Sequence, residues 1–234
     1  AFGAFASKLS VGGETAGARF DPQANLWPVT SGRFAGQRQA ITYQLGDGGN
    51  LDNTGVLAAL QRGAASVVAL INADAPLGED VDLCSPARGA DPAAQATGQL
   101  VQLFGFKGGA SLKFGFYEDN QVFDKSALPP LLCDLSKLAR KGRPLVARRR
   151  LEVLRNARWG IEGGAEVDIV FVLLSKCKEF EALLPAATRA EVARGELGAL
   201  DRFPNYRTVF QTGDLTRLTR VQANLLAAQA EYSV

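Results

Sequence analysis

The sequence contains no histidine, which removes the usual general base of hydrolases and the commonest protein ligand for transition metals. Any Ser-His-Asp or Cys-His mechanism confined to this chain is therefore excluded. Methionine is also absent, so we expect that Ala1 is not a translation start and that the chain comes from the inside of something longer. No apolar run approaches the roughly 18 to 20 residues that a membrane-spanning helix needs. We predict no transmembrane segment, although the protein can still work at a membrane surface.

Cysteine is scarce, and the three residues Cys84, Cys133 and Cys177 are an odd number at wide spacings. Because they form no C-x-x-C pair, the pattern suggests neither a zinc site nor a disulfide framework, and it favours a reducing compartment. The formal net charge is only +2, so the charge balance does not imply binding to nucleic acid. We interpret the densest basic cluster, residues 148–150, as a solvated strand end, with anionic lipid headgroups or a protein partner as alternatives.

The hydrophobic pattern predicts a mixed α/β fold over residues 1–234 as a single domain. Hydrophobic residues make up 47% of the chain and charged residues 21%, which is ordinary for a globular protein. Three parts support the prediction: a βαβ unit over 36–76, a β-hairpin over 145–175, and a mainly helical segment over 177–234. Further helices are predicted over 93–104 and 128–140, the second opened by two prolines.

The predicted βαβ unit is the firmest part of this interpretation. A strand over 38–45 is followed by a helix with capping oxygens from residues 52–54 and by Gly63 at its C-terminal end. The continuous apolar run over 66–71 then predicts a parallel strand that is covered on both faces.

The first strand of this unit ends at Asp47, followed by Gly48 and Gly49. A side chain at the carboxyl end of such a strand projects into the crevice where open α/β sheets place their chemistry. The two glycines permit positive φ and a sharp turn that holds the carboxylate out. The triplet alone is also typical of an ordinary strand-to-helix turn with a capping acid. An EF-hand calcium loop does not fit, because Asp47, Asn50 and Asp52 fall at positions 1, 4 and 6.

The wider segment Tyr43 to Gly63, with the apolar strand that follows, resembles the catalytic-aspartate segment of patatin-like and cytosolic phospholipases. The preceding Leu26-Trp-Pro-Val29 resembles the same family, as do the later segments 203–211 and 221–226. The resemblance covers most of the chain, and its specificity is concentrated between residues 43 and 76.

This resemblance implies a patatin-like three-layer sandwich with a mainly parallel central sheet. It also implies a Ser-Asp dyad, in which a serine in a Gly-x-Ser-x-Gly elbow attacks a lipid ester and the Asp-Gly-Gly aspartate is its only side-chain partner. Asp47 matches that aspartate and would orient and deprotonate the serine, while Gly48 and Gly49 supply turn or oxyanion backbone. The chemistry needs neither histidine nor a metal or other cofactor. The implied substrates are glycerophospholipids or galactolipids.

The sequence departs from the family pattern at the nucleophile. No serine lies in a Gly-x-Ser-x-Gly frame, and the frame around Thr15 has threonine at its centre and no apolar strand before it. The glycine run of the oxyanion hole is missing as well. We therefore expect the chain to be the later part of such a fold, lacking its first strands and its nucleophile elbow. Three explanations of the missing serine are open. The protein is processed and the serine lies on a second polypeptide, the sequence is incomplete, or the protein is a scaffold that has lost catalysis.

Other side chains are interpreted structurally. We attribute the acids Glu162, Glu166 and Asp168 to strand alternation and turn solvation, and we expect Trp159 to pack at the base of its loop. The phenylalanines at 104, 106, 114 and 116 are predicted to pack in a core or along a strand rather than face a membrane.

Two functional hypotheses follow from these observations. The first is a portion of a lipid acyl hydrolase whose partners are a lipid substrate or membrane surface and a second polypeptide with the nucleophile. The second is a non-catalytic scaffold or interaction subunit of a membrane-associated assembly. The location of the protein is left open by the sequence, and a plastid is compatible with the family's spread in algae and bacteria.

Overall fold

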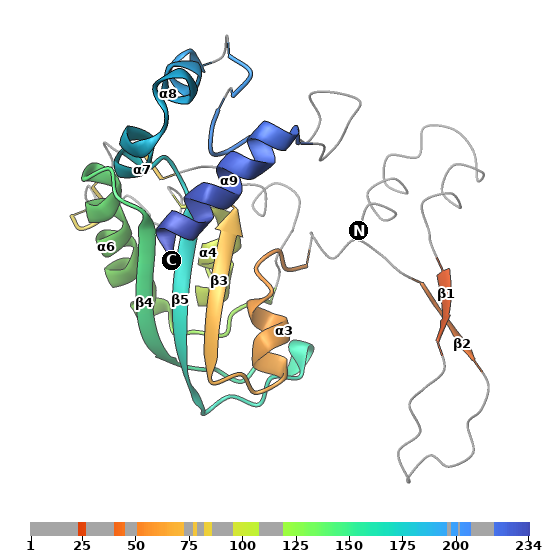
Figure 1. Ribbon diagram of the computed structural model, residues 1–234. Helices are drawn as coiled ribbons and strands as arrows, with labels where there is room; N and C mark the ends of the chain where they lie inside the picture. The colour runs from red at the N-terminus through yellow and green to blue at the C-terminus, as the bar shows by residue number, and fades with distance from the viewer. Residues whose placement is uncertain are drawn as a thin grey trace, which may run out of the picture. The chain divides into compact units, whose positions relative to one another are not determined.

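A computed structural model describes residues 23–26, 40–44, 51–72, 77–78, 82–85, 96–107, 119–195, 198–200, 202–206 and 218–234 (Figure 1). The chain divides into two compact units, Ala1–Leu51 and Asp52–Val234, where the sequence predicts one domain. In the first unit, β1 (Gln23–Leu26) pairs antiparallel with β2 (Ile41–Gln44). β2 lies within the predicted strand 38–45. A βαβ unit requires this strand to pair in parallel with the strand that begins at Ser66. Within the described residues β2 pairs with β1 instead, so the predicted βαβ pairing is not observed there.

The second unit is built on a three-stranded sheet with the order β3-β5-β4. β3 (Ser66–Asn72) runs parallel to β5 (Glu166–Leu174), with Ser66 opposite Asp168. β4 (Leu145–Glu152) runs antiparallel to β5, with Leu145 opposite Leu173, and forms the hairpin that the sequence predicts. The sheet is therefore small and mixed rather than mainly parallel, and the α/β class is confirmed in this coarse form.

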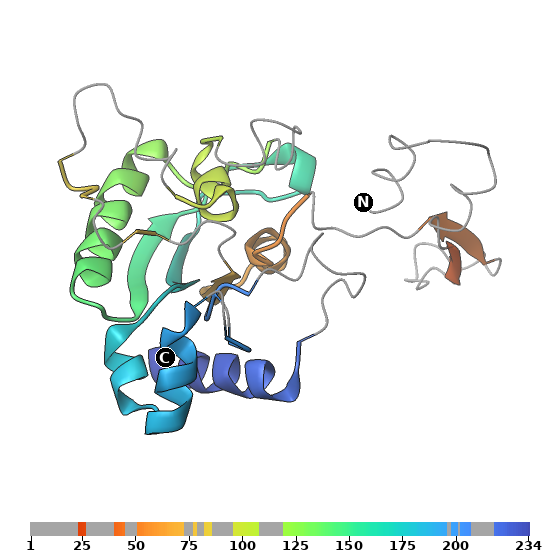
Figure 2. The same cartoon turned by 90° about the horizontal axis from the view of Figure 1, so that it is seen from above.

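Helices lie on both faces of this sheet. Figure 2 shows α3 (Val56–Gln61), α4 (Gly98–Val101) and α6 (Leu128–Arg140) on one face and α9 (Arg220–Ser233) on the other. α6 has the predicted bounds, with prolines in its first turn, where the backbone N–H groups have no partner within the helix. α9 begins at a capping box of Thr219 and Gln222. The remaining elements are the helices α7 (Lys178–Leu183) and α8 (Ala186–Ala193) and the 3-10 turns η3 (Gln102–Phe104), η4 (Lys125–Ala127) and η5 (Ala157–Trp159).

The main core lies between the sheet and α3, α4 and α6. Side chains of alternate strand positions face it, among them Ile71, Ile169 and Phe171, each at most 1% exposed. Phe104 of η3 packs against Phe171 with ring centroids 6.1 Å apart. Burial of this face contributes most of the hydrophobic stabilisation, because each fully buried side chain of this size is worth about 1.5–3 kcal/mol.

The opposite face of β3 differs from the prediction. The apolar run over 66–71 was expected to be covered on both faces, yet Val68 is 57% and Leu70 is 59% exposed. The reason is that α9 reaches only the carboxyl ends of β3 and β5, where Leu226 and Gln229 face Leu70 and Val172 across a small apolar groove. A continuous apolar run therefore identifies the strand correctly but not the cover on its second face.

The expectation of unpaired cysteines is wrong for two of the three. Cys84 and Cys133 form a disulfide that joins the segment 82–85 to α6. A 3.5 Å ion pair between Arg140 and Asp82 reinforces the same junction. A sequence with wide cysteine spacing cannot reveal this pairing, because only the fold brings α6 beside residue 84. The disulfide also removes the basis for favouring a reducing compartment.

In the described part of the chain, no helix combines the length and apolar character required to cross a membrane.

Candidate functional site

The residues on which the functional prediction depends, Asp47, Gly48 and Gly49, lie outside the described residues, as does Thr15. After the Asp-Gly-Gly turn, the next residue that the structure describes is Leu51, which lies five residues before α3 begins. What the structure describes downstream of the predicted aspartate is the turn that leads into α3, beginning with Asp52.

Asp52 and Thr54 organise the entry to α3. The carboxylate of Asp52 accepts hydrogen bonds from the backbone N–H of Thr54 at 2.8 Å and from its hydroxyl at 2.7 Å. The Thr54 hydroxyl in turn accepts from the backbone N–H of Val56 at 3.1 Å. Gly55 has φ +69°, which is costly for any residue with a Cβ. The predicted oxygens at 52 and 54 therefore hold this turn, four and two residues before the helix begins, while the N-cap itself, Gly55, has no side-chain cap.

The exit from α3 also follows the prediction. Gly63 takes the left-handed conformation with φ +69°, and its N–H donates to the carbonyl of Leu60 at 3.0 Å. Three residues later β3 begins against β5. The sequence pattern of helix, glycine and apolar strand is confirmed over residues 56–72.

The acids Glu166 and Asp168 of the hairpin are paired with the basic cluster rather than gathered into a site. On the outer face of the sheet, Arg150 binds Glu166 at 2.7 Å and Arg148 lies 3.6 Å from Asp168. Arg149, between them, faces the other way and binds Asp134 of α6 at 2.7 Å, which lowers the pKa of that carboxyl group. Strand alternation accounts for Glu166 and Asp168, as predicted. The interpretation of residues 148–150 as a solvated strand end is wrong, because these arginines lie within β4 and each is in an ion pair.

Cys177 is the one thiol that the disulfide leaves, and its environment opposes reactivity. It is 1% exposed, and its sulfur accepts a hydrogen bond from the N–H of Phe180 at the start of α7. Burial raises the pKa of this thiol, so the nucleophilic thiolate is disfavoured. Cys177 therefore acts as a capping and packing residue.

A buried polar network does form at a place that the sequence did not single out. Asn120 is 2% exposed and hydrogen-bonds to Gln102, while its side-chain oxygen accepts from the indole N–H of Trp159 at 2.8 Å. Trp159 thus packs at the base of its loop, as predicted, and also uses its only polar group. The network links η3, the segment 119–121 and η5.

Asn156 ties the hairpin loop to the segment 119–121. Its side-chain N–H group donates to the carbonyls of Asp119 at 2.7 Å and Gln121 at 3.0 Å. Gly163 lies against the backbone of Arg155, where an added Cβ would overlap it, and its φ is +78°. The hairpin loop can therefore approach the strand end closely only with glycine at this position.

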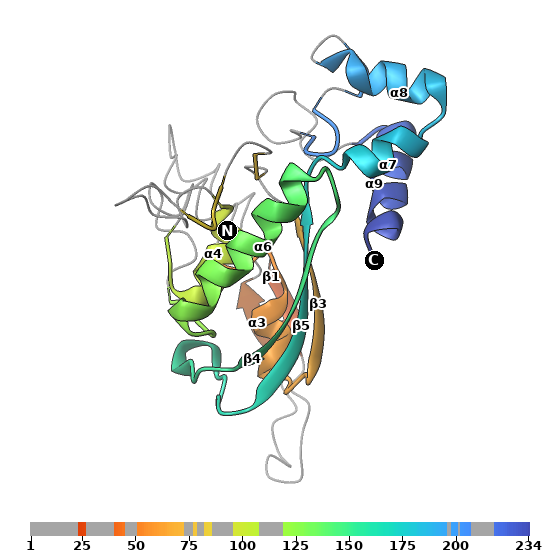
Figure 3. The same ribbon diagram turned by 90° about the vertical axis from the view of Figure 1, so that its left-hand side faces the viewer.

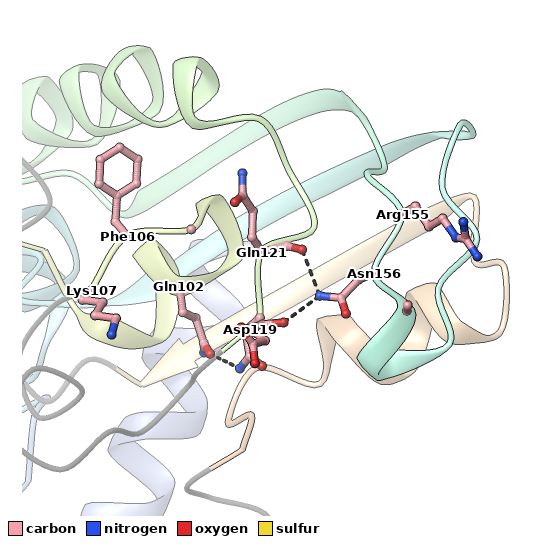
Figure 4. A pocket seen from close by; sticks show the side chains of 10 residues that line it. Gln102, Phe106, Lys107, Asp119, Gln121, Arg155 and Asn156 are labelled. Atoms are coloured by element: carbon pink, nitrogen blue, oxygen red, sulfur yellow. Dashed lines mark hydrogen bonds between the residues drawn. The ribbon is translucent and has the colours of Figure 1, made fainter.

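These elements enclose a polar cleft of about 600 Å³ between η3 and the hairpin loop. Figure 4 shows Lys107 and Arg155 toward opposite ends of the group, with Asp119 and Asn156 between them. The carboxylate of Asp119 is engaged by Arg158 at 2.9 Å, and no ion pair of Lys107 or Arg155 is found within the described residues. The lining is otherwise made of amides, backbone and one aromatic ring: Gln102, Gly105, Phe106, Asn120, Gln121 and Ala157.

The described lining of this cleft offers amides, one carboxylate and two cations, groups that can bind a polar molecule. Its lining contains neither serine nor cysteine, and the described residues hold no cluster of three or more acids or cysteines suited to a metal. Most of its amide groups already serve the network. The sequence signal that was missed is the polar run Asp119-Asn120-Gln121, followed by apolar residues that bury it.

Comparisons with models of known families, with curated proteins and with solved structures find no match to this chain.

Proposed function

We propose that this chain is a portion of a lipid acyl hydrolase and that it contributes the catalytic aspartate, Asp47, to a Ser-Asp dyad. The serine belongs to another segment or polypeptide, because no serine here lies in a Gly-x-Ser-x-Gly frame. The observation that carries the proposal is the segment Tyr43 to Gly63 with its Asp-Gly-Gly turn, which resembles the aspartate segment of patatin-like phospholipases.

The local structure after the turn supports this proposal. α3 and β3 follow Asp47 in the order that the resemblance implies, and β3 lies parallel to β5 in a sheet with helices on both faces. We extend this arrangement to a patatin-like three-layer sandwich, in which further strands would complete a mainly parallel sheet beside β3. The free edge of β3 in the described residues is compatible with such an addition.

The proposed chemistry is acyl transfer to serine followed by hydrolysis. Asp47 accepts the proton of the serine hydroxyl as it attacks the ester carbonyl of a glycerophospholipid or galactolipid, and returns a proton to the leaving alcohol. Water then repeats the attack on the acyl-enzyme. A chain without histidine is compatible with this dyad, because the carboxylate alone acts as the base.

The test uses the chain isolated with its bound partners and a serine-directed fluorophosphonate probe. We expect labelling of the segment or partner polypeptide that carries the serine, and none within residues 1–234. Asp47→Asn should lower ester hydrolysis by about 100- to 10,000-fold, the range for loss of a general base, while thermal unfolding stays unchanged. Asp52→Asn is the matched control, since asparagine retains the oxygen that accepts from Thr54 and hydrolysis should persist.

A fluorophosphonate-negative preparation without ester hydrolysis would refute the hydrolase. Loss of folding in Asp47→Asn but not in Asp52→Asn would instead assign Asp47 to a structural turn.

The second candidate is a non-catalytic interaction subunit, and the exposed sheet face favours it. Val68 and Leu70 are more than half exposed on an edge strand of the second unit. Large apolar side chains at such an edge are typical of surfaces that another chain covers. Under this alternative, Leu70→Asp should release a co-purifying partner, whereas Asp47→Asn should have no effect on its retention.

A further inference from the structure

The helical pair α7–α8 presents an apolar surface that the rest of the described residues leave uncovered. Leu183, the last residue of α7, is 69% exposed, and Pro185, Ala186 and Ala187 after it are exposed as well. α8 buries none of its residues. Figure 3 shows this pair beyond the end of the sheet and away from α6, with α8 outermost. Leu183 and residues 185–187 therefore form an apolar projection, whereas Leu184 and Val192 of the same pair pack against a second, smaller core around Phe180 and Phe203.

The base of the pair is fixed in place. Phe180 of α7 is 6% exposed and packs against Phe203 and Tyr232 with ring centroids 6.2 Å and 5.6 Å apart. The N–H of Glu179 donates to the carbonyl of Gly142 at 3.1 Å. Leu183 thus lies at the C-terminal end of a helix whose first turn is anchored by Glu179 and Phe180.

Cationic side chains lie near the apolar tip, and one of them, Arg189, donates a hydrogen bond to the carbonyl of Ala182, next to Leu183, at 3.0 Å. A groove of about 470 Å³ between α7 and α8 is lined by three cationic side chains and one carboxylate, Lys176, Lys178, Arg189 and Glu181. The other acids of the pair are engaged elsewhere, because Glu179 lies 3.5 Å from Arg143 and Glu191 lies 3.1 Å from Arg194. The groove therefore carries an excess of positive charge beside the exposed leucine.

We propose that the α7–α8 tip docks on an anionic lipid surface, with Leu183 inserted among acyl chains and with Lys176 and Arg189 at the headgroup phosphates. Interfacial binding depends on buried apolar area together with attraction to anionic lipid, and this tip offers both within two adjacent helices. A protein partner would need a complementary acidic rim around an apolar socket, whereas an anionic bilayer supplies both over its whole area. The inference goes beyond the hydrolase proposal, because it concerns residues other than Asp47 and requires no hydrolysis.

The experiment is vesicle co-flotation of the full chain. Vesicles of phosphatidylcholine mixed with phosphatidylserine should capture the protein, and vesicles of phosphatidylcholine alone should not. Capture should be lost near 1 M salt, where the screening length falls to about 3 Å. Leu183→Ser should weaken binding by about tenfold, somewhat less than full burial of a leucine would give. Lys176→Gln with Arg189→Gln should weaken it by about 30-fold, at about fivefold for each cation near an anionic membrane.

Two exposed positions outside the pair provide matched controls. Val221→Ser removes an apolar side chain that is 60% exposed on α9, and Arg62→Gln removes an exposed cation at the end of α3. Both should bind vesicles like the parent chain, and all variants should keep the parent's melting temperature.

Equal binding to neutral and anionic vesicles, or equal loss in the control variants, would overturn the proposal. Self-association of the parent chain that Leu183→Ser abolishes, without vesicle capture, would assign the tip to a protein interface and would also overturn it. Vesicle capture with no ester hydrolysis would leave this inference standing and count against the hydrolase alone.

Discussion

The two faces of the β3-β5-β4 sheet are built from the same strands but are covered very differently. On the inner face, Ile71, Ile169 and Phe171 are at most 1% exposed beneath α3, α4 and α6. On the outer face, Val68 and Leu70 are more than half exposed, and α9 covers only the carboxyl end of the strands. The inner face therefore determines the stability of the second unit, while the outer face is available for contact with other molecules.

The largest effect is expected from the centre of the inner face. Phe171→Ala removes a fully buried ring that packs on Phe104, and should lower the free energy of unfolding by about 3–5 kcal/mol. Chemical denaturation checks this value. Phe171→Leu keeps most of the volume and should cost less than about 1.5 kcal/mol. Equal costs for the two variants would show that the inner face is not tightly packed.

The disulfide should give the next largest effect, because it joins the segment 82–85 to α6 on the inner side. It closes a loop with a sequence separation of 49 residues, and cross-links of this size stabilise by about 2–4 kcal/mol. Reduction, or the double variant Cys84→Ala with Cys133→Ala, should lower the melting temperature correspondingly. Cys177→Ala, with reductant present and absent, shows whether the effect of reductant belongs to the Cys84–Cys133 pair alone.

The sequence predicted the individual strands and helices of the second unit better than it predicted which strands pair with each other. β3, α6 and the β4-β5 hairpin follow from local patterns, such as the apolar run after Gly63 and the two prolines that open α6. The parallel pairing of Ser66 with Asp168 joins residues about a hundred positions apart. The sequence of neither strand indicates which other strand it pairs with. The Cys84–Cys133 disulfide depends on the same long-range packing.

The candidate sites divide in a similar way. The Asp52–Thr54 turn and the left-handed Gly63 were predictable, because turn and capping preferences are local. The polar cleft was not, because Gln102, Asn120 and Asn156 become a group only when η3 meets the hairpin loop. Asp47 stays a prediction that the sequence alone supports.

A smaller effect is expected in the second, smaller core beside α7 and α9, which is formed by Cys177, Phe180, Leu200, Phe203 and Leu225. Tyr206 has its hydroxyl buried with no hydrogen-bond partner in the described residues, so Tyr206→Phe should be neutral or stabilise by up to about 1 kcal/mol at pH 7. Burial raises the pKa of this phenol to about 12, above the value of about 10 in an unfolded chain. Between these values the folded state keeps a proton that the unfolded state has lost, so stability falls as the pH rises from 10 to 12.

The measurement is the free energy of unfolding of both proteins across that pH window. The parent should lose stability faster than Tyr206→Phe, and the difference isolates this tyrosine from the other groups that titrate there. Parallel curves would show that Tyr206 is hydrated in solution.

The smallest effect should come from the outer face, where neighbouring residues of β3 make the comparison within a single strand. Leu70 is 59% exposed and Ile71 is 1% exposed, although the two are adjacent and both apolar. Leu70→Ala should change the free energy of unfolding by no more than about 0.5 kcal/mol, as surface substitutions usually do, whereas Ile71→Ala should cost about 2–5 kcal/mol. Because both remove a similar apolar volume from the same strand, strand propensity cannot account for such a difference. If Leu70→Ala proves as costly as Ile71→Ala, a partner or a second copy covers the outer face under the conditions measured. A dependence of that cost on protein concentration would then identify self-association as the cover.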